Sequence, residues 1–426
     1  MEDRLHRTRR IGARHFGTFV AAGIVATALF GFAGEVRAAG FALKEQSATA
    51  LGNSFAGATA GAEDVSYMFF NPAGLTRHDG QQAAAVLSYI IPFSESKDAV
   101  GDISGFIPAG GESVTGDAAD DALVPAVYGL WSVTPDLKLA LGVNAPFGLT
   151  TEYSRTWQGR YHAVESSIAT ININPAIAYR FNENLSIGAG LQAQYFDTTL
   201  SNMVPSGGGD LFFEVEGDDW AYGFNIGAMY EFSDSTRLGL AYRSQIKQEI
   251  EGDATFLGNS TGARTKITTP DSASIGLYHD YSDAFAVMAE IGWTGWSSFD
   301  EVVINLDNNI GVGTTITLPE DWNDVWFFAL GATWRPTEQW AIRGGVAYDQ
   351  SPIPEYTRTP RLPGQNRTWV ALGAQYVVSP NFTIDAGYTH IFFENADINV
   401  TNAIGNLQAT FKGYIDIVTA QATIRF

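Results

Sequence analysis

The chain contains arginines that could recognise a carboxylate. Arg243 and Arg343 fall on the polar face of segments in which apolar and polar residues alternate, and Arg361 lies in the run TRTPRLPGQNR. A guanidinium is planar and offers parallel N–H donors that match the two oxygens of a carboxylate. Each of the three is therefore a candidate anchor for a carboxylate ligand. The alternative is that these arginines form ion pairs with acids on the same face, namely Glu290, Asp349 and Asp385.

Other side chains argue against catalysis and metal binding. The chain has no cysteine, which excludes a thiolate nucleophile, a thiolate metal site and a disulfide. No motif marks a lipase-like Ser–His pair. The histidines after residue 38 lack the spacing of metal ligands; they are His78, His162, His279 and His390. The formal net charge of −21 argues against nucleic acid as a partner. We therefore expect neither an enzyme nor a metal or other cofactor.

The elements that carry these charges alternate with the period of a β-strand. In the C-terminal run VTAQATIRF every second residue is apolar, and the residues between are Thr, Gln and Arg. Such a strand suits lipid outside and a wet lumen inside. The segments LSIGAGLQAQY, WFFALGATW and WAIRGGVAYD repeat the pattern, with Trp and Tyr near segment ends as in the girdles at membrane interfaces. The terminal Phe426 resembles the assembly signal of bacterial outer-membrane barrels.

Short polar turns set the number of strands. Six tight reversals occur, at TPDL, NENL, SDST, YSDA, PTEQ and SPNF. Between them lie seven longer polar connections, at about 93–121, 154–163, 201–217, 250–265, 305–321, 351–366 and 398–410. Together they join fourteen strands, with short turns facing the periplasm and long loops facing outside. The sequence thus predicts an all-β fold, a 14-stranded antiparallel transmembrane β-barrel over residues 81–426.

The N-terminal part differs from the rest. Residues 1–38 combine a basic leader, an apolar run and small residues before a cleavage site, which predicts a signal peptide cut after Ala38; a membrane-anchor helix is the rival interpretation. Residues 39–80 do not alternate and are rich in Gly, Ala and Ser. They also contain apolar residues such as Phe55, which a solvated tail would leave exposed to water. We therefore expect a hatch, or plug, inside the barrel lumen.

One segment, ALGVNAPFGLTTEY, begins like a strand and is then interrupted at Pro146, with Gly148 beside it. Proline has no N–H to leave unpaired, and glycine permits a sharp backbone turn. The following strand, ININPAIAY, is interrupted at Pro175. Backbone groups that face lipid must be paired, so these residues could leave the ladder and open a window in the wall. An ordinary bulge that shapes the barrel is the alternative.

Three stretches resemble the FadL family of outer-membrane transporters, which includes long-chain fatty acid and toluene channels: AGFAL, YMFFNPAGLTR and NAPFGLTTEYSRTWQGRYHAVESSIATININPAIAY. The resemblance spans the chain after residue 38 and implies a barrel closed by an N-terminal hatch. It also implies that hydrophobic substrates are captured outside, pass to a pocket near the N-terminus and leave sideways through the wall. On this pattern the hatch or gating residues are Phe41, Asn71, Pro72 and Ala73, and the window residues are Asn144, Ala145, Pro146, Phe147, Gly148 and Pro175.

We therefore expect passive transport of a small hydrophobic compound, a long-chain fatty acid or related hydrocarbon, across the outer membrane of a Gram-negative bacterium. The expected partners are this substrate, outer-membrane lipid and lipopolysaccharide, and the expected state is a monomer. A general porin for polar solutes and a surface adhesin are the alternatives. A porin needs an open lumen, whereas a hatch fills it.

Overall fold

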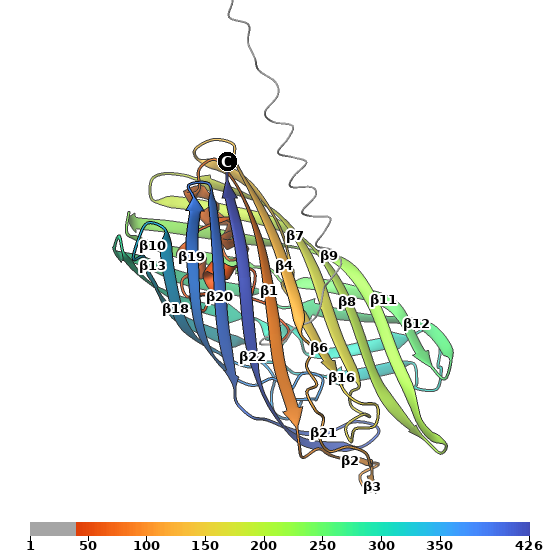
Figure 1. Cartoon of the computed structure of the whole chain (residues 1–426). Helices are drawn as coiled ribbons and strands as arrows, with labels where there is room; N and C mark the ends of the chain where they lie inside the picture. The colour runs from red at the N-terminus through yellow and green to blue at the C-terminus, as the bar shows by residue number, and fades with distance from the viewer. Residues whose placement is uncertain (1–39) are drawn as a thin grey trace, which may run out of the picture. The chain divides into compact units, whose positions relative to one another are not determined.

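Strand pairing closes the described part of the chain, residues 40–426, into a ring. In the computed structural model, β1 (Gln81–Ser96) pairs on one side with β22 (Asn406–Arg425) and on the other with β4 (Ala122–Ser132). The ring is antiparallel and has fourteen strands, so the predicted barrel is confirmed (Figure 1). The other strands of the ring are, in order, β5 (Leu137–Asn144), β7 (Glu165–Arg180), β8 (Leu185–Ser206), β9 (Gly209–Ser233), β10 (Thr236–Arg243), β13 (Ser272–Ser282), β14 (Phe285–Thr294), β17 (Val325–Trp334), β18 (Trp340–Asp349), β19 (Arg367–Ser379) and β20 (Phe382–Phe393). The expected signal peptide lies outside the described residues and stays a prediction.

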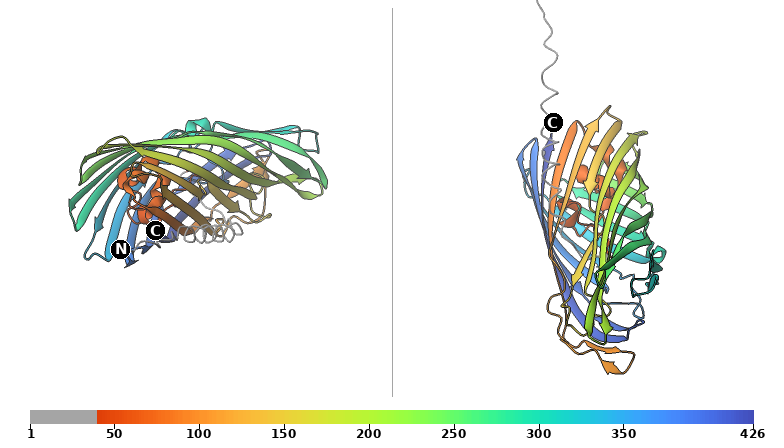
Figure 2. Two further views of the ribbon diagram at one scale, coloured as in Figure 1. Left: turned by 90° about the horizontal axis from the view of Figure 1, so that it is seen from above. Right: turned by 90° about the vertical axis from the view of Figure 1, so that its right-hand side faces the viewer.

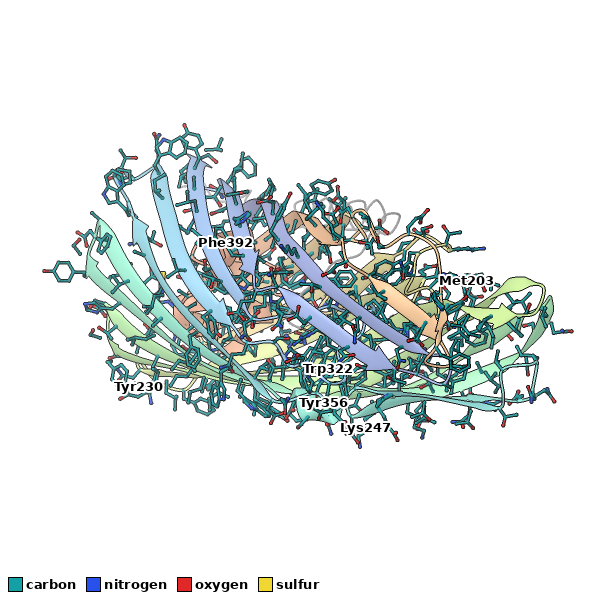
Figure 3. The ribbon with its side chains drawn as sticks, turned by 90° about the horizontal axis from the view of Figure 1, so that it is seen from below. Met203, Tyr230, Lys247, Trp322, Tyr356 and Phe392 are labelled. Carbon is teal, nitrogen blue, oxygen red and sulfur yellow. The ribbon has the colours of Figure 1, made fainter. Side chains whose placement is uncertain are left out.

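The two faces of the strands differ as the alternation predicts. On β22, Val418 and Ile424 are exposed on the outside, whereas Thr419, Gln421 and Thr423 are buried inside. An apolar outer face and a polar inner face are what a barrel in lipid requires. Figure 3 shows Tyr230 and Lys247 at the outer margin of the strands, with Trp322 inward of them.

Several predicted loops are instead paired strands that extend beyond the main ring. The tip of the β8–β9 hairpin is only residues 207–208, so the predicted connection 201–217 is wrong. The same correction applies to parts of 250–265, 305–321 and 398–410. These segments were not recognised because their alternation is the reverse of a lipid-facing strand's: charged residues such as Lys247 and Glu249 are exposed, whereas apolar residues such as Ile250 and Phe256 are buried. The strands concerned are β11 (Ile246–Phe256), β12 (Asn259–Thr269), β15 (Glu301–Leu306), β16 (Thr315–Pro319) and β21 (Ala396–Thr401).

Two short strands and a single helical turn complete the loops. β2 (Val100–Ile103) and β3 (Ile107–Pro108) lie in the connection from β1 to β4, and η3 (Trp296–Ser298) follows β14. The six tight reversals of the sequence all connect neighbouring strands of the ring, as predicted.

Residues 40–80 form short helices inside the ring, where Figure 2 shows them surrounded by strands. Most of their residues are buried. Wall glycines allow their backbone to approach closely: a Cβ on Gly345 would lie 2.1 Å from the carbonyl oxygen of Asn53. We call this segment the hatch; its helices are α2 (Ala48–Leu51), α3 (Ala58–Gly61), η1 (Val65–Phe69) and η2 (Pro72–Arg77). Among residues 40–426, no helix is long and apolar enough to cross a membrane.

Candidate functional site

The ladder is open on one side of the interrupted strand. β5 stops at Asn144, and β6 (Gly148–Glu152) resumes at Gly148. The pairing between β4 and β5 ends at Val127–Val143, and the next contact between these two stretches is an isolated bridge from Ala119 to Thr151. Residues 122–126 of β4 therefore have ladder partners on β1 alone within the described chain. The break that the sequence places at Pro146 is thus a gap in the hydrogen-bonded wall.

On its other side the interrupted strand stays attached to β7. The pairs Asn144–Asn172 and Gly148–Ala169 flank the break, so residues 145–147 face residues 170–171. One strand contributes an extra residue, which is the definition of a β-bulge. The segment is therefore a bulge toward β7 and borders a gap in the ladder toward β4, while a window for substrate at this place stays a prediction.

The hatch supplies the hydrogen bonds that the missing ladder would have made. Leu43 N donates to Pro146 O at 2.8 Å, and Gly148 N donates to Phe41 O at 2.9 Å. The Gln46 side chain donates to Ala145 O at 2.7 Å. Because a buried backbone group without a partner is costly, these bonds explain how the segment can turn inward. Residues 41–43 act as a short additional strand against it.

Two details differ from the sequence interpretation. Gly148 does not have a positive φ, so it makes no sharp turn; instead a Cβ there would lie 3.1 Å from Leu43 Cδ1, and glycine makes room for the hatch. Pro175 pairs in register with Leu141 of β5, and the ladder it interrupts is the one between β7 and β8. It therefore does not border the gap. Its position on a strand gave no information about which of the two neighbouring ladders it would interrupt.

Phe41 lies at the centre of an aromatic cluster. Its side chain is 1% exposed, and four rings surround it at centroid distances of 4.8 Å (Trp296), 5.4 Å (Phe299), 5.7 Å (Phe147) and 5.8 Å (Trp322). Next to this cluster is a cavity of about 60 Å³, which we call the outer cavity. Its apolar lining includes Phe41, Leu149, Ile168, Phe299 and Trp322.

The outer cavity also contains Arg361 and Glu320, both outside the barrel strands. Arg361 donates to Ser166 Oγ at 2.9 Å and to the carbonyl oxygen of Glu165 at 3.0 Å. Burial lowers the pKa of Arg361 to about 10, and burial raises the pKa of Glu320 to about 8. Arg361 therefore carries its charge at neutral pH beside an acid that burial keeps mostly protonated.

A second cavity, of about 140 Å³, lies next to the inturned segment; we call it the inner cavity. Pro146 and Phe147 line it, as do Ala42, Leu43 and Lys44 of the hatch. Since Phe41 lines the outer cavity and residues 42–44 line the inner one, the N-terminal end of the hatch separates the two. Arg243 and Glu290 contribute charges to the inner cavity.

Asn71 connects the hatch to itself and to the wall. Its Oδ1 accepts from Ala73 N at 2.9 Å and so caps η2, which starts at Pro72. Its Nδ2 donates to Thr59 O at 2.7 Å and to Ala228 O of β9 at 3.0 Å. Asn71, Pro72 and Ala73 are all buried, so the motif is a packed turn inside the barrel.

The three candidate arginines have different surroundings. Arg343 donates to Glu63 at 2.7 Å and to Asp385 at 2.9 Å, so carboxylates of the protein already bind its guanidinium group. Arg361 hydrogen-bonds to backbone and Ser oxygens of the outer cavity. Arg243 donates to Gln192 and, at 2.7 Å, to the carbonyl oxygen of Phe69. Arg343 thus joins hatch to wall, whereas the other two line cavities.

Sequence reasoning missed several residues of the site. Gln46, Lys44 and Thr170 gave no signal beyond their type, although a lone lysine in the otherwise apolar start GFALK could have been noticed. Thr170 Oγ1 accepts from Phe147 N at 3.0 Å and donates to Phe147 O at 2.6 Å, replacing one ladder pair. Trp296 and Trp322 lie in loops, where an aromatic residue is not distinctive.

Comparisons with known proteins agree with this architecture. Residues 29–426 match the family model described as outer membrane protein transport protein (OMPP1/FadL/TodX). The chain is 29% identical to a 47 kDa outer membrane protein of Pasteurella multocida, covering 86% of this chain and 90% of that protein. It is 25% identical to a long-chain fatty acid transport protein of Escherichia coli K12, covering 85% and 89%. Among solved structures, a Pseudomonas aeruginosa FadL homologue superposes with a TM-score of 0.84 at 24% identity, covering 91% of this chain and 100% of that one. The Pseudomonas putida toluene transporter TodX gives 0.68 at 16% identity, covering 91% and 99%.

Proposed function

The chain belongs to the OMPP1/FadL/TodX family of outer membrane transport proteins, and on that premise we propose that long-chain fatty acids or related hydrocarbons cross the outer membrane through it by lateral exit. It is a transporter of hydrophobic compounds rather than an enzyme. In the proposed route, substrate enters the outer cavity, displaces the N-terminal end of the hatch, passes the inner cavity and leaves through the gap between β4 and the inturned segment.

The observation that carries this proposal is the contact between the hatch and the gap. The backbone of residues 41–43 is bonded to the inturned segment, with cavities on both sides. A ligand that separates these two pieces would join the cavities and free the segment beside the gap. Breaking the three hydrogen bonds made by Leu43, Gly148 and Gln46 costs about 3 kcal/mol at about 1 kcal/mol each. Burial of about 120 Å² of apolar substrate surface, at about 25 cal/mol per Å², would offset that cost.

Lipid is the favourable destination for such a substrate. Leaving through the wall keeps apolar surface away from the aqueous periplasm, which is worth about 25 cal/mol per Å². No energy source is needed, since the substrate moves toward an apolar phase. The strands of the ring pair with one another all the way round, and we propose a monomer surrounded by outer-membrane lipid and lipopolysaccharide.

The hatch argues against the alternative of a general porin. Short helices with mostly buried residues occupy the lumen, whereas a porin for polar solutes needs a water-filled passage. Planar-bilayer recording tests this difference: we expect no large steady ion current, and a porin-like conductance would refute the plugged route.

Deleting Pro146 tests lateral exit. Residues 145–147 face residues 170–171, so removing one residue equalises the two stretches and lets the strand run straight. We expect uptake of a fluorescent fatty acid into proteoliposomes to be lost. Heat-modifiable migration on SDS gels should show that the barrel still assembles.

A second one-residue deletion provides the matched control. The β13–β14 pairing shifts register between Asp280 and Ser282, so Tyr281 is an extra residue beside the turn of a hairpin that does not border the gap. Its deletion should leave uptake unchanged. If the Pro146 deletion variant still takes up fatty acid although its structure shows a continuous β4–β5 ladder, the lateral route is wrong.

A further inference from the structure

We infer that residues 351–366 form a lid over the outer cavity, and that substrate enters when the tip of this lid, held by Arg361, separates from the opposite wall of the barrel. We call this segment the lid. The inference rests on the proposed transport function and adds the step by which substrate reaches the outer cavity. It gives Arg361 a role in holding the lid rather than in recognising a ligand.

The lid connects β18 to β19, and its tip contacts strands on the opposite side of the ring. The tip bonds to residues of β6, β7 and β8. In ring order, β20, β22, β1, β4 and β5 lie between β19 and β7, whereas β8, β9, β10, β13, β14 and β17 lie between β7 and β18. The lid therefore crosses the lumen, at the end where the long connections lie.

Arg361 binds the opposite wall through neutral oxygens. It donates to Glu165 O at 3.0 Å, to Ser166 Oγ at 2.9 Å and to Ser201 O at 3.2 Å. Within residues 40–426, no ion pair involves Arg361. Hydrogen bonds to neutral groups contribute little net free energy, because water replaces them when they break. The tip is therefore held by contacts that can release reversibly.

Two hydroxyl groups of the same wall also hold the tip. Thr151 Oγ1 donates to Arg361 O at 3.1 Å, and the Tyr153 hydroxyl donates to Pro360 O at 2.7 Å. Both acceptors are backbone carbonyls of the lid. Removing one hydroxyl from the wall would therefore loosen the tip without changing the sequence of the lid.

The base of the lid is attached to neighbouring parts of the chain. Asn323, which precedes β17, donates its N–H to Pro352 O at 2.9 Å, and Arg358 donates to Asp397 O of β21 at 2.9 Å. Proline fixes φ, and the lid contains four prolines, Pro352, Pro354, Pro360 and Pro363. A segment with this composition is suited to move as a stiff piece, with its base attached and its tip released.

The lid bounds the outer cavity. Its apolar residues Ile353 and Leu362 are buried and line the cavity together with Leu149 and Ile168 of the opposite wall. One water needs about 10–15 Å³, so the cavity of about 60 Å³ has room for a few waters. A long alkyl chain does not fit while the tip is docked. Release of the tip would enlarge the cavity and open it toward Phe41 of the hatch.

The test locks the tip with a disulfide, which is unambiguous because the chain has no cysteine. Thr151→Cys with Arg361→Cys places two thiols where Thr151 Oγ1 and Arg361 O lie 3.1 Å apart. Association of radiolabelled dodecanoate with the full chain in non-ionic detergent is followed by rapid filtration. We expect at least tenfold slower association in the oxidised form than in the reduced form of the same variant. This comparison cancels the effect of losing the arginine. If the thiols do not oxidise, a short bifunctional methanethiosulfonate reagent joins them.

A second disulfide provides the matched control. Asn323→Cys with Pro352→Cys joins the base of the lid to the residue that it already contacts. Because the base stays attached when the tip moves, oxidation of this pair should change the association rate less than twofold.

Loosening the tip should have the opposite effect. Tyr153→Phe removes the hydroxyl that bonds to Pro360 O, and loss of one such bond should raise the open population, and with it the association rate, about fivefold. Tyr278→Phe is the matched control, because Tyr278 is also buried and its hydroxyl accepts from Arg335 at 2.6 Å. Its association rate should stay unchanged. Faster binding is a result that damage to the fold would not produce.

The outcomes separate the lid from the transport function. An oxidised tip that binds dodecanoate as fast as the reduced tip overturns the inference, and so does equal slowing by the control disulfide. If the cysteine variant does not assemble, a faster rate in Tyr153→Phe alone supports the lid, and an unchanged or lower rate refutes it. Uptake of dodecanoate by proteoliposomes with the unaltered chain is measured separately. Absence of uptake refutes the proposed transport, whereas uptake together with unslowed binding to the oxidised tip refutes only the lid.

Discussion

Replacing Asn71 by alanine should loosen the hatch without unfolding the barrel. Asn71 is 2% exposed and makes three hydrogen bonds, with Ala73 N, Thr59 O and Ala228 O. At about 1 kcal/mol for each bond, the substitution costs about 3 kcal/mol. The strands of the ring are paired independently of this side chain, so the cost falls on docking of the hatch. A change of about 1.4 kcal/mol is tenfold in an equilibrium constant, and we therefore expect about a hundredfold more frequent local opening.

Hydrogen exchange read by mass spectrometry measures this opening directly. Peptides from residues 58–77 should exchange about a hundredfold faster in Asn71→Ala, while peptides from β18 and β19 keep their protection. Fatty acid uptake should fall, because Asn71 binds the carbonyl of Thr59, and Thr59 holds Glu290 in the lining of the inner cavity.

Asn53→Ala is the matched control. Asn53 is an equally buried hatch residue, but its side chain has one long hydrogen bond, to Thr333 Oγ1 at 3.3 Å. Exchange should rise at most about tenfold there. If the two variants exchange alike, or if Asn71→Ala changes exchange by less than threefold, the reasoning that three bonds hold the hatch at this point is wrong.

Two further perturbations follow from the buried charges. Arg343→Met would leave Glu63 and Asp385 without their counterion. We expect hydrogen exchange to show hatch docking weakened by about 3–5 kcal/mol. A loss below about 1 kcal/mol, or an equal loss in the exposed control Arg264→Met, would contradict this expectation. Burial raises the pKa of Glu320 to about 8, above its ordinary value of 4.5, so the folded chain holds this proton more tightly than the unfolded chain, and stability should fall as the pH rises from about 4.5 toward about 8. We expect the urea unfolding free energy to drop by about 1–2 kcal/mol between about pH 5 and pH 9, because the side chain is only partly buried; the same drop in Glu320→Gln would assign it to other groups.

The barrel itself could be predicted because lipid imposes a simple rule on each strand. An outer face in hydrocarbon must be apolar, while an inner face may be polar, so VTAQATIRF shows its two faces without knowledge of its neighbours. Tight polar turns mark strand ends just as locally. The extensions of β8, β9, β11 and β12 were missed for the complementary reason that their exposed face is polar and their buried face is apolar, which reverses the pattern that lipid imposes.

The sequence alone determined where the third strand breaks, but it did not determine which of the two neighbouring ladders opens. Pro146 can leave a ladder because it has no N–H, and this is a property of the residue alone. Which ladder opens is a property of the neighbours: β4 loses its partner beyond Val127–Val143, whereas β7 keeps its own with one bulged residue. Pro175, with the same local chemistry, interrupts the opposite edge of β7.

Which arginine could meet a ligand was decided entirely by tertiary structure. Arg343, Arg243 and Arg361 share the same donors, and the sequence offers each the same chemistry. Arg343 is neutralised by Glu63, which lies far away in the sequence and reaches it only because the hatch folds back into the lumen. Arg243 donates to Phe69 of the same hatch and forms no ion pair with an acid of residues 40–426. Charge pairing depends on distances of a few ångströms between distant segments, and the period of a strand carries no information about those distances.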